Sequence, residues 1–156
     1  MVRRTDLVQE ILREAPIKIG DSNKAVVVFF DLRCPFCARL FRESESYFVE
    51  LARGGAVTYA MCDYIVHDDA VPLHLMLREV NGVEKRLKLI EDIYSGKVKA
   101  RGKERNKGIA CHKLAEELGV FGTPSLLLYD LARGEGKLFS GYIPLALIKD
   151  IIFKFL

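Results

Sequence analysis

The sequence lacks any apolar run close to the roughly 20 residues that a membrane-spanning helix needs. We therefore expect no insertion into a membrane. It also lacks the apolar middle and the small-residue cleavage site of a secretory signal. The first residues, MVRRTDLVQEILREAP, instead form an amphipathic pattern interrupted by acidic and amide side chains. On this basis we expect a cytoplasmic protein.

Cysteine and the amide residues are scarce. Four cysteines in 156 residues are too few for a disulfide scaffold, and a close-spaced pair in a cytoplasmic protein indicates redox or metal chemistry. Gln9 is the only glutamine, and asparagine is also rare, in a chain rich in lysine, arginine and glutamate. This composition favours a thermophilic source, in which intracellular disulfides are tolerated.

The net charge of +3 is small, so it gives no argument for a nucleic-acid partner. Lysine and arginine alternate with other residues over 97–107, but no aromatic side chains lie between them to stack on bases. We expect this segment to be a solvated loop rather than a surface for an anionic partner.

The pattern of apolar residues predicts one α/β domain over residues 1–156, which is large enough to bury a core without disulfides. Strands are predicted at residues 23–31, 56–66, 124–130 and 136–142. Helices are predicted at residues 5–14, from Pro35 to Gly54, at 70–95, at 109–118 and after Pro144. The expected architecture is a central mixed sheet of four or five strands flanked by helices, with residues 70–107 as a helical insertion.

Two cysteines, Cys34 and Cys37, lie where the first predicted strand gives way to a helix, in the stretch VFFDLRCPFC. A thiol attacks only as a thiolate, and the free N–H groups and positive end of a helix stabilise that anion. Arg33 adds a positive charge, and Asp31 either caps or tunes the site or is a plain turn residue. Cys37, one turn further on, suits the resolving role, in which it releases the mixed disulfide formed on Cys34.

The segments FDLRCPFC and GVFGTPSLLLYD resemble the thioredoxin-fold disulfide oxidoreductases. In that family an X-cis-Pro pair precedes the third core strand and lies against the active disulfide, and Thr123-Pro124 matches that pair. IYSGK and GYIPLALIKDII make the likeness strongest to the catalytic domain of the periplasmic disulfide isomerases DsbC and DsbG, over about residues 18–155.

The resemblance implies a thioredoxin fold and an enzyme that exchanges disulfides with cysteine-containing proteins. It implies catalytic roles for Cys34 and Cys37, with no cofactor beyond their redox-active disulfide. A redox partner such as a thioredoxin-reductase-like protein or a membrane oxidase is also expected. A groove for an extended polypeptide would be formed by Pro35, Phe36, Thr123 and Pro124. The Pro-Phe dipeptide is nearer to the Pro-His of the oxidase DsbA than to the Gly-Tyr of DsbC, so the direction of exchange stays open.

Several alternatives accompany this interpretation. Cys62 and Cys111 are isolated in the sequence, and we favour two buried free thiols over a disulfide between them. A zinc site built from all four cysteines is disfavoured, because such sites usually combine two close-spaced pairs. The histidines lack ligand spacing and are expected to have polar surface roles: His67, His74 and His112. A second hypothesis for the whole chain is a non-enzymatic redox-sensing or client-binding module.

Overall fold

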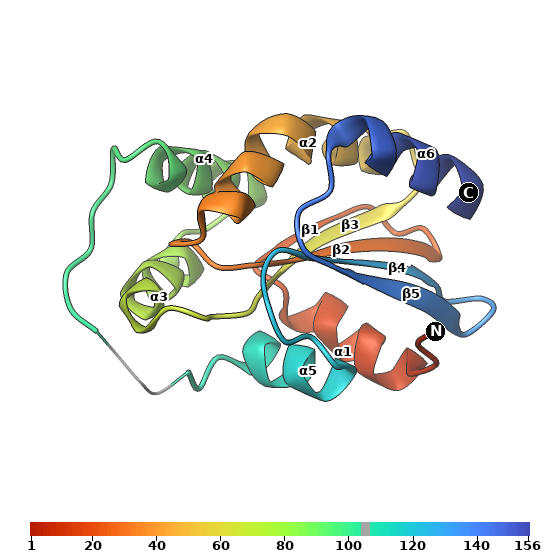
Figure 1. The fold of residues 1–156 in the computed structure, drawn as a ribbon, viewed down its shortest axis with the longest axis horizontal. Coiled ribbons are helices and arrows are strands. Elements are labelled where there is room, and N and C mark those ends of the chain that lie inside the picture. Colours follow the sequence, from red (N-terminus) through yellow and green to blue (C-terminus); the bar gives the residue numbers. More distant parts are fainter. Residues whose placement is uncertain (104–106) are drawn as a thin grey trace.

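The computed structural model describes residues 1–103 and 107–156. Its centre is a five-stranded sheet with the strand order β1-β3-β2-β4-β5 (Figure 1). Only β2 and β3 are parallel; the other neighbouring pairs are antiparallel. The predicted mixed sheet is therefore confirmed. The strands are β1 (Ile17–Ile19), β2 (Lys24–Phe30), β3 (Thr58–Asp63), β4 (Ser125–Asp130) and β5 (Glu135–Ser140).

Helices cover both faces of the sheet, and further helices lie beyond one end of its strands (Figure 1). On one face lie α2 (Pro35–Arg53) and α6 (Leu145–Phe155), and on the other α1 (Thr5–Glu14) and α5 (Ala110–Leu118). The insertion after β3 consists of a 3₁₀ turn (Asp68–Ala70), α3 (Val71–Glu79) and α4 (Val83–Tyr94). Among the described residues, no helix is both long and apolar enough to span a membrane.

The two cores follow from the side-chain alternation of β2. Successive residues of a strand point to opposite faces, and β2 is buried on both because it pairs with β3 and β4. Val26, Val28 and Phe30 pack with α2 and α6. Ala25, Val27 and Phe29 pack with α1 and α5. This explains why the strand is continuously apolar rather than alternating.

Two features differ from the sequence prediction. The short strand β1 was not predicted, because three residues are too few to show a period. The helix predicted over 70–95 is broken into two after Glu79, and Gly82 between them has φ +100°, a conformation that only glycine adopts readily.

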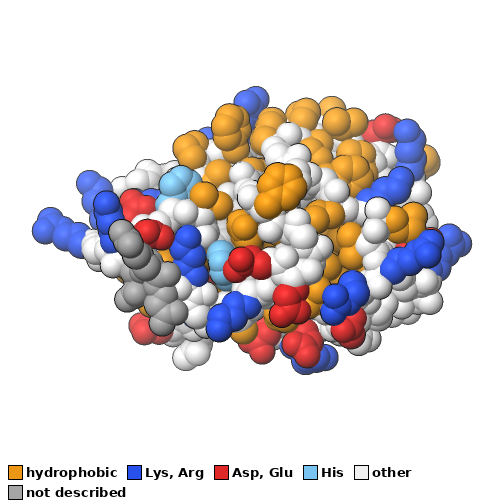
Figure 2. Space-filling view, turned by 60° about the horizontal axis from the view of Figure 1, so that its bottom comes forward, with side chains coloured by type: hydrophobic (Ala, Val, Ile, Leu, Met, Phe, Trp, Pro, Cys, Tyr) orange, Lys and Arg blue, Asp and Glu red, His pale blue; other side chains and the backbone are white. Residues whose placement is uncertain are grey.

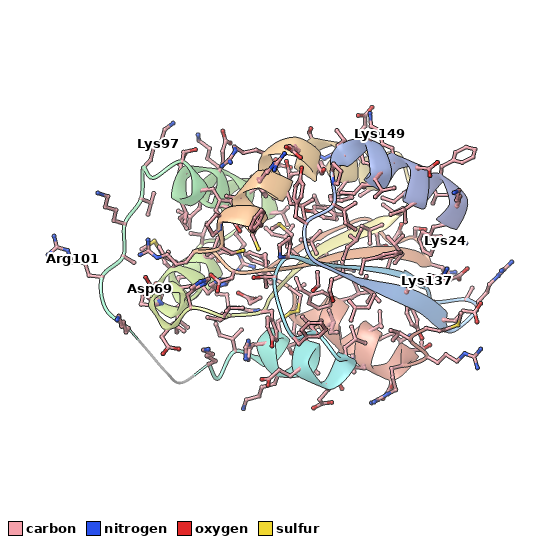
Figure 3. All side chains as sticks on the ribbon, viewed as in Figure 1. Lys24, Asp69, Lys97, Arg101, Lys137 and Lys149 are labelled. Atoms are coloured by element: carbon pink, nitrogen blue, oxygen red, sulfur yellow. A yellow bond between two sulfur atoms is a disulfide. The ribbon has the colours of Figure 1, made fainter. Side chains whose placement is uncertain are left out.

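The basic segment 97–107 has no helix or strand in its described part. Lys97 and Arg101 are exposed and project away from the body of the protein (Figure 3). Lys107 pairs with Asp68 at 3.4 Å. The prediction for Arg105 lies outside the described residues.

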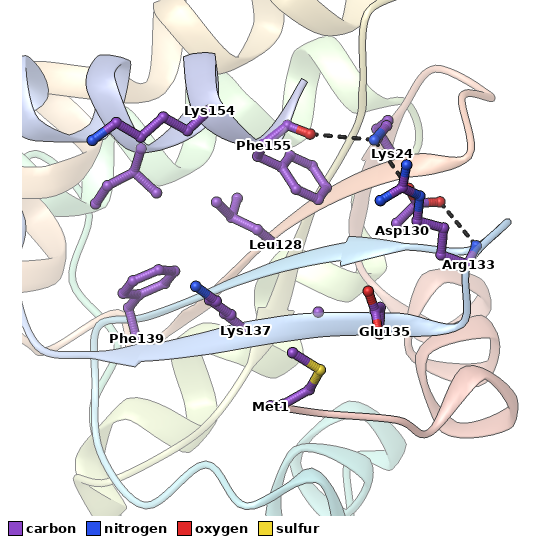
Figure 4. A pocket seen from close by; sticks show the side chains of 12 residues that line it. Met1, Lys24, Leu128, Asp130, Arg133, Glu135, Lys137, Phe139, Lys154 and Phe155 are labelled. Carbon is purple, nitrogen blue, oxygen red and sulfur yellow. Dashed lines mark hydrogen bonds and ion pairs between the residues drawn. The ribbon is translucent and has the colours of Figure 1, made fainter.

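One cavity lies away from the cysteines. It measures about 490 Å³ and opens between β5 and α6, with Lys24, Phe139 and Phe155 in its lining (Figure 4). Lys24 begins β2, whereas the cysteine motif follows the other end of that strand. This cavity therefore takes no part in the chemistry of the motif.

Candidate active site

The site is built on the turn that joins β2 to α2. The backbone N–H of Cys34 donates to the carbonyl of Asp31 at 3.1 Å, and the N–H of Arg33 donates to its Oδ1 at 2.7 Å. The other carboxylate oxygen of Asp31 accepts the N–H groups of Val66 and His67, at 2.7 and 2.8 Å. Asp31 is fully buried. It therefore ties the turn before Cys34 to the segment that follows the neighbouring strand β3.

Cys34 is the N-cap of α2, and Pro35 occupies the first helical position. Proline fits there because its missing N–H would have no partner within the helix. The sulfur of Cys34 accepts the backbone N–H of Cys37 at 3.4 Å. Both cysteines are free thiols and both are buried, with 6% of Cys34 and 3% of Cys37 exposed. The local structure thus directs helix N–H groups at the first sulfur.

The two thiols have very different acidities. The pKa of Cys34 is lowered to about 5, chiefly by a hydrogen bond from the Cys37 thiol, against the opposing effect of burial. The side chain of Thr123 and the N–H groups of Cys37 and Phe36 add to the lowering. Burial, followed by the hydrogen bond to Cys34, raises the pKa of Cys37. At neutral pH the pair therefore holds one thiolate, on Cys34.

The loop before β4 approaches the same sulfur. The peptide bond between Thr123 and Pro124 is cis, and the carbonyl oxygen of Thr123 lies 3.6 Å from the sulfur of Cys34. Pro124 is buried, while Thr123 is partly exposed. The structure thus brings together the two segments, 34–37 and 123–124, that the sequence analysis singled out.

Apolar side chains are exposed around the motif. Phe36 is 57% exposed and Phe121, two residues before Thr123, is 77% exposed. Tyr142 lies 6.3 Å from Phe36, between ring centroids. Figure 2 shows hydrophobic side chains gathered over the middle of one face, with charged groups along its lower edge. Sequence reasoning missed Phe121, although an aromatic residue inside the GVFGTP segment was an available signal.

Arg33 does not turn toward the sulfur. Its guanidinium donates to the carbonyl of Ala100 at 3.1 Å and lies 3.6 Å from the carboxylate of Asp69. The tuning role of Arg33 therefore stays a prediction.

The second pair of cysteines corrects the sequence analysis. Cys62 and Cys111 are not free thiols but form a disulfide, with their Cα atoms 5.6 Å apart. The prediction failed because the partners are 49 residues apart and only the packing of α5 against β3 brings them together. Their bond also removes the zinc alternative, which needed these two sulfurs as ligands beside Cys34 and Cys37.

The expectation of surface roles is wrong for two of the three histidines. His74 is fully buried and His112 is only 7% exposed, whereas His67 is exposed. Both buried rings accept a backbone N–H, which lets a neutral imidazole replace water as a partner.

Comparisons with known proteins agree on the fold. A family model described as a thioredoxin-like domain matches residues 12–156. The disulfide interchange protein from Neisseria gonorrhoeae shares 29% identity, with a TM-score of 0.63, over 92% of this chain and 96% of that one. BdbD from Bacillus subtilis gives 15% identity and a TM-score of 0.68, over 92% and 94% of the two chains. DsbA2 from Pseudomonas aeruginosa shares 15% identity, with a TM-score of 0.67, over 91% of this chain and 94% of that one.

A comparison with curated proteins gives no match. The structural matches confirm the thioredoxin-like fold with its helical insertion. They include BdbD and several DsbA proteins, so the finer resemblance to DsbC and DsbG stays a prediction.

The prediction of a cytoplasmic location is wrong. The structures that resemble this chain belong to a class of disulfide oxidoreductases that acts outside the cytoplasm, and they point to the same location here. The Cys62–Cys111 disulfide agrees, because disulfides persist mainly in oxidising compartments. The prediction used the first residues, which report on secretion only where they are the start of the precursor chain.

Proposed function

Because this chain belongs to the family of thioredoxin-like domains, we propose that it is a thiol–disulfide oxidoreductase of the DsbA type that oxidises cysteine pairs in other proteins. The observation that carries the proposal is the state of Cys34. It caps α2, its pKa is lowered to about 5, and it lies 3.6 Å from the carbonyl of Thr123. A thiol of this kind is both a good nucleophile and a good leaving group.

The exchange takes two steps. A substrate thiolate attacks the sulfur of Cys34 in the oxidised pair; the bond to Cys37 breaks, and the Cys37 sulfur takes up a proton. A second substrate thiolate then attacks the substrate sulfur of this mixed disulfide and releases Cys34 as a thiolate. The substrate loses two electrons to the cysteine pair and gains a disulfide.

The acidity of Cys34 favours this direction over reduction. Stabilising the Cys34 thiolate stabilises the reduced form of the protein, which makes its disulfide more oxidising. Burial raises the pKa of Cys37, so this second thiol stays protonated at neutral pH. A disulfide that oxidises its substrates needs an electron acceptor to restore it. A membrane oxidase is therefore a more suitable redox partner than a thioredoxin-reductase-like protein.

The substrate is an extended polypeptide that carries cysteine. The backbone of Thr123 offers pairing beside the Cys34 sulfur, and the exposed side chains of Phe36 and Phe121 offer apolar surface on the two segments that meet there. Pro35 and Pro124 belong to the same docking surface, because Pro35 follows Cys34 and Pro124 follows Thr123 in the chain.

A reduction potential tests the proposal. The Cys34–Cys37 couple is equilibrated against a series of glutathione ratios, and the oxidised protein is assayed for turnover with a peptide that contains two cysteines. We expect a potential nearer to the value of about −120 mV for DsbA than to about −270 mV for thioredoxin. A value near that of thioredoxin would indicate a reductant. A couple that reacts with glutathione but gives no turnover would favour the redox-sensing module.

A further inference from the structure

Three backbone N–H groups of the active-site turn, those of Leu32, Arg33 and Cys34, bind acceptors other than the Cys34 sulfur. The N–H groups of Arg33 and Cys34 go to Asp31, as described above. The N–H of Leu32, the first of the three, donates to the Nε2 of His74 at 3.0 Å. Leu32 is buried, so this N–H has no access to water in place of the imidazole. Of these three N–H groups, that of Leu32 is the one whose acceptor, His74, lies outside the turn.

His74 is itself held in place by a buried ion pair. Its Nδ1 lies 2.7 Å from one oxygen of Asp63, the last residue of β3, and Arg78 donates to the other oxygen at 2.6 Å. The ring also packs on Phe30, with centroids 5.1 Å apart. His74 and Asp63 are both fully buried. Strands β2 and β3 and the turn before α2 therefore converge on this one side chain of α3.

These contacts determine the tautomer of the imidazole. Because Leu32 N–H is a donor, Nε2 must be the bare nitrogen, and Nδ1 carries the hydrogen that it donates to Asp63. The arrangement looks like the Asp–His pair of a general base, but its accepting nitrogen is occupied by a backbone amide. His74 is therefore built to hold the turn and not to move a proton.

We propose that His74 is a positioning residue for disulfide exchange, which holds Leu32 N–H and so fixes the turn that directs the N–H groups of α2 at Cys34. The importance of this contact for disulfide exchange rests on the proposed function. The contact itself is independent of any substrate. Without the acceptor, the buried N–H of Leu32 would lack a partner. A turn that rotates to give it one would lengthen the bonds to the sulfur.

The chain contains a matched control. The Nδ1 of His112 accepts the N–H of Ile65 at 2.9 Å, and its Nε2 pairs with Glu116 at 3.0 Å. This is the same arrangement, a backbone N–H bound by an imidazole that is paired with a carboxylate, on the segment after β3. That segment carries no cysteine of the motif. Replacing His112 removes an equivalent buried acceptor that has no direct contact with the turn before Cys34; the link between them runs through Val66, whose N–H binds Asp31.

The test measures the acidity of Cys34 in the reduced protein, from the pH dependence of its alkylation by iodoacetamide. His74→Phe keeps the ring packing and loses the acceptor, and His74→Gln restores an acceptor oxygen. We expect His74→Phe to raise the pKa of Cys34 by about one unit, which slows alkylation about tenfold below pH 5. His74→Gln should stay close to the unsubstituted protein. His112→Phe should leave the pKa of Cys34 unchanged.

Two results would overturn the proposal: an unchanged pKa in His74→Phe, or an equal shift in His112→Phe, which would mean general loosening. If His74→Phe fails to fold, Asp63→Asn reaches the same bond. Its amide can donate to Nδ1 and move the hydrogen to Nε2, which then repels Leu32 N–H. A smaller shift in the same direction supports the proposal, and no shift contradicts it. Because alkylation needs no substrate protein, a negative result here leaves the proposed function intact, and a failure of turnover leaves this test valid.

Discussion

The two cysteine pairs of this protein lie near the same end of the sheet but on opposite faces. Cys34 and Cys37 belong to the core beneath α2 and α6, and Cys62 and Cys111 to the core beneath α1 and α5. The first pair are neighbours on one helical turn. The second joins β3 to α5 across 49 residues.

The difference between the pairs shows what makes a buried cysteine reactive. Cys62 and Cys111 are fully buried, and their sulfurs are used by their bond to each other. Cys34 is almost as buried, yet its sulfur accepts hydrogen bonds from the first turn of a helix and faces a loop that exposes Phe121. Hydrogen-bond donors aimed at the sulfur, together with an open neighbouring surface, decide the reactivity more than burial does.

The largest effect is expected from separating the two active cysteines. Cys34→Ser should reduce exchange to the uncatalysed background, because it removes the attacked sulfur. Cys37→Ser cannot form the internal disulfide, but its Cys34 thiolate can still attack a disulfide of a substrate protein and displace one substrate thiolate. With no Cys37 thiol to release the resulting mixed disulfide, this variant should accumulate adducts on Cys34, visible as bands that disappear on reduction. Trapping by the Cys34→Ser variant and not by Cys37→Ser would reverse the assigned roles.

A second large effect should fall on stability alone. Replacing Cys62 and Cys111 together by alanine removes a link across 49 residues and should lower the free energy of unfolding by about 2–4 kcal/mol. Urea unfolding measures this loss, with Cys34→Ser as the control that keeps the link. Exchange under conditions where the variant stays folded should be unchanged. A loss of exchange as large as in Cys34→Ser would show that the second pair takes part in the chemistry.

The reactive pair should also make stability depend on pH. The pKa of Cys34 is lowered from an ordinary value of 9.0 to about 5. A lowered pKa contributes its full stabilisation above pH 9, and the contribution is lost as the pH falls through about 5. The free energy of unfolding of the reduced protein, minus that of Cys34→Ser, should therefore rise between pH 5 and pH 9. A difference that stays constant over this range would contradict the lowered pKa.

The smallest effect is expected at the exposed aromatic residues. Phe121→Ser should weaken substrate docking by about 1 kcal/mol, which is roughly a fivefold increase in KM, while the pKa of Cys34 stays unchanged. Phe153, which is 81% exposed on α6, provides the control. It lies two residues from Phe155, whose carbonyl binds Lys24 at the opposite end of β2. An equal increase in KM for Phe153→Ser would rule out a specific docking role for Phe121.

Much of the site could be predicted from local pattern. Pro35 at the first helical position and the spacing of Cys34 and Cys37 placed a thiol at the start of a helix, where the structure has it. The pairing of this motif with Thr123-Pro124 came from the resemblance to a family and not from physical reasoning on the residues. The exposure of Phe121 needed the structure, because no periodic pattern surrounds it.

Most of the longer elements were determined by the sequence alone, since periodicity and turn residues act within a few positions. The apolar run of β2, Pro35 and Gly119 set strands, a helix start and a helix end that the structure retains. Tertiary structure alone decided what meets across long separations. The disulfide of Cys62 joins residues 49 positions apart, and the bond from Leu32 to His74 spans 42. Such contacts depend on how whole elements pack, and a local pattern carries no record of that geometry.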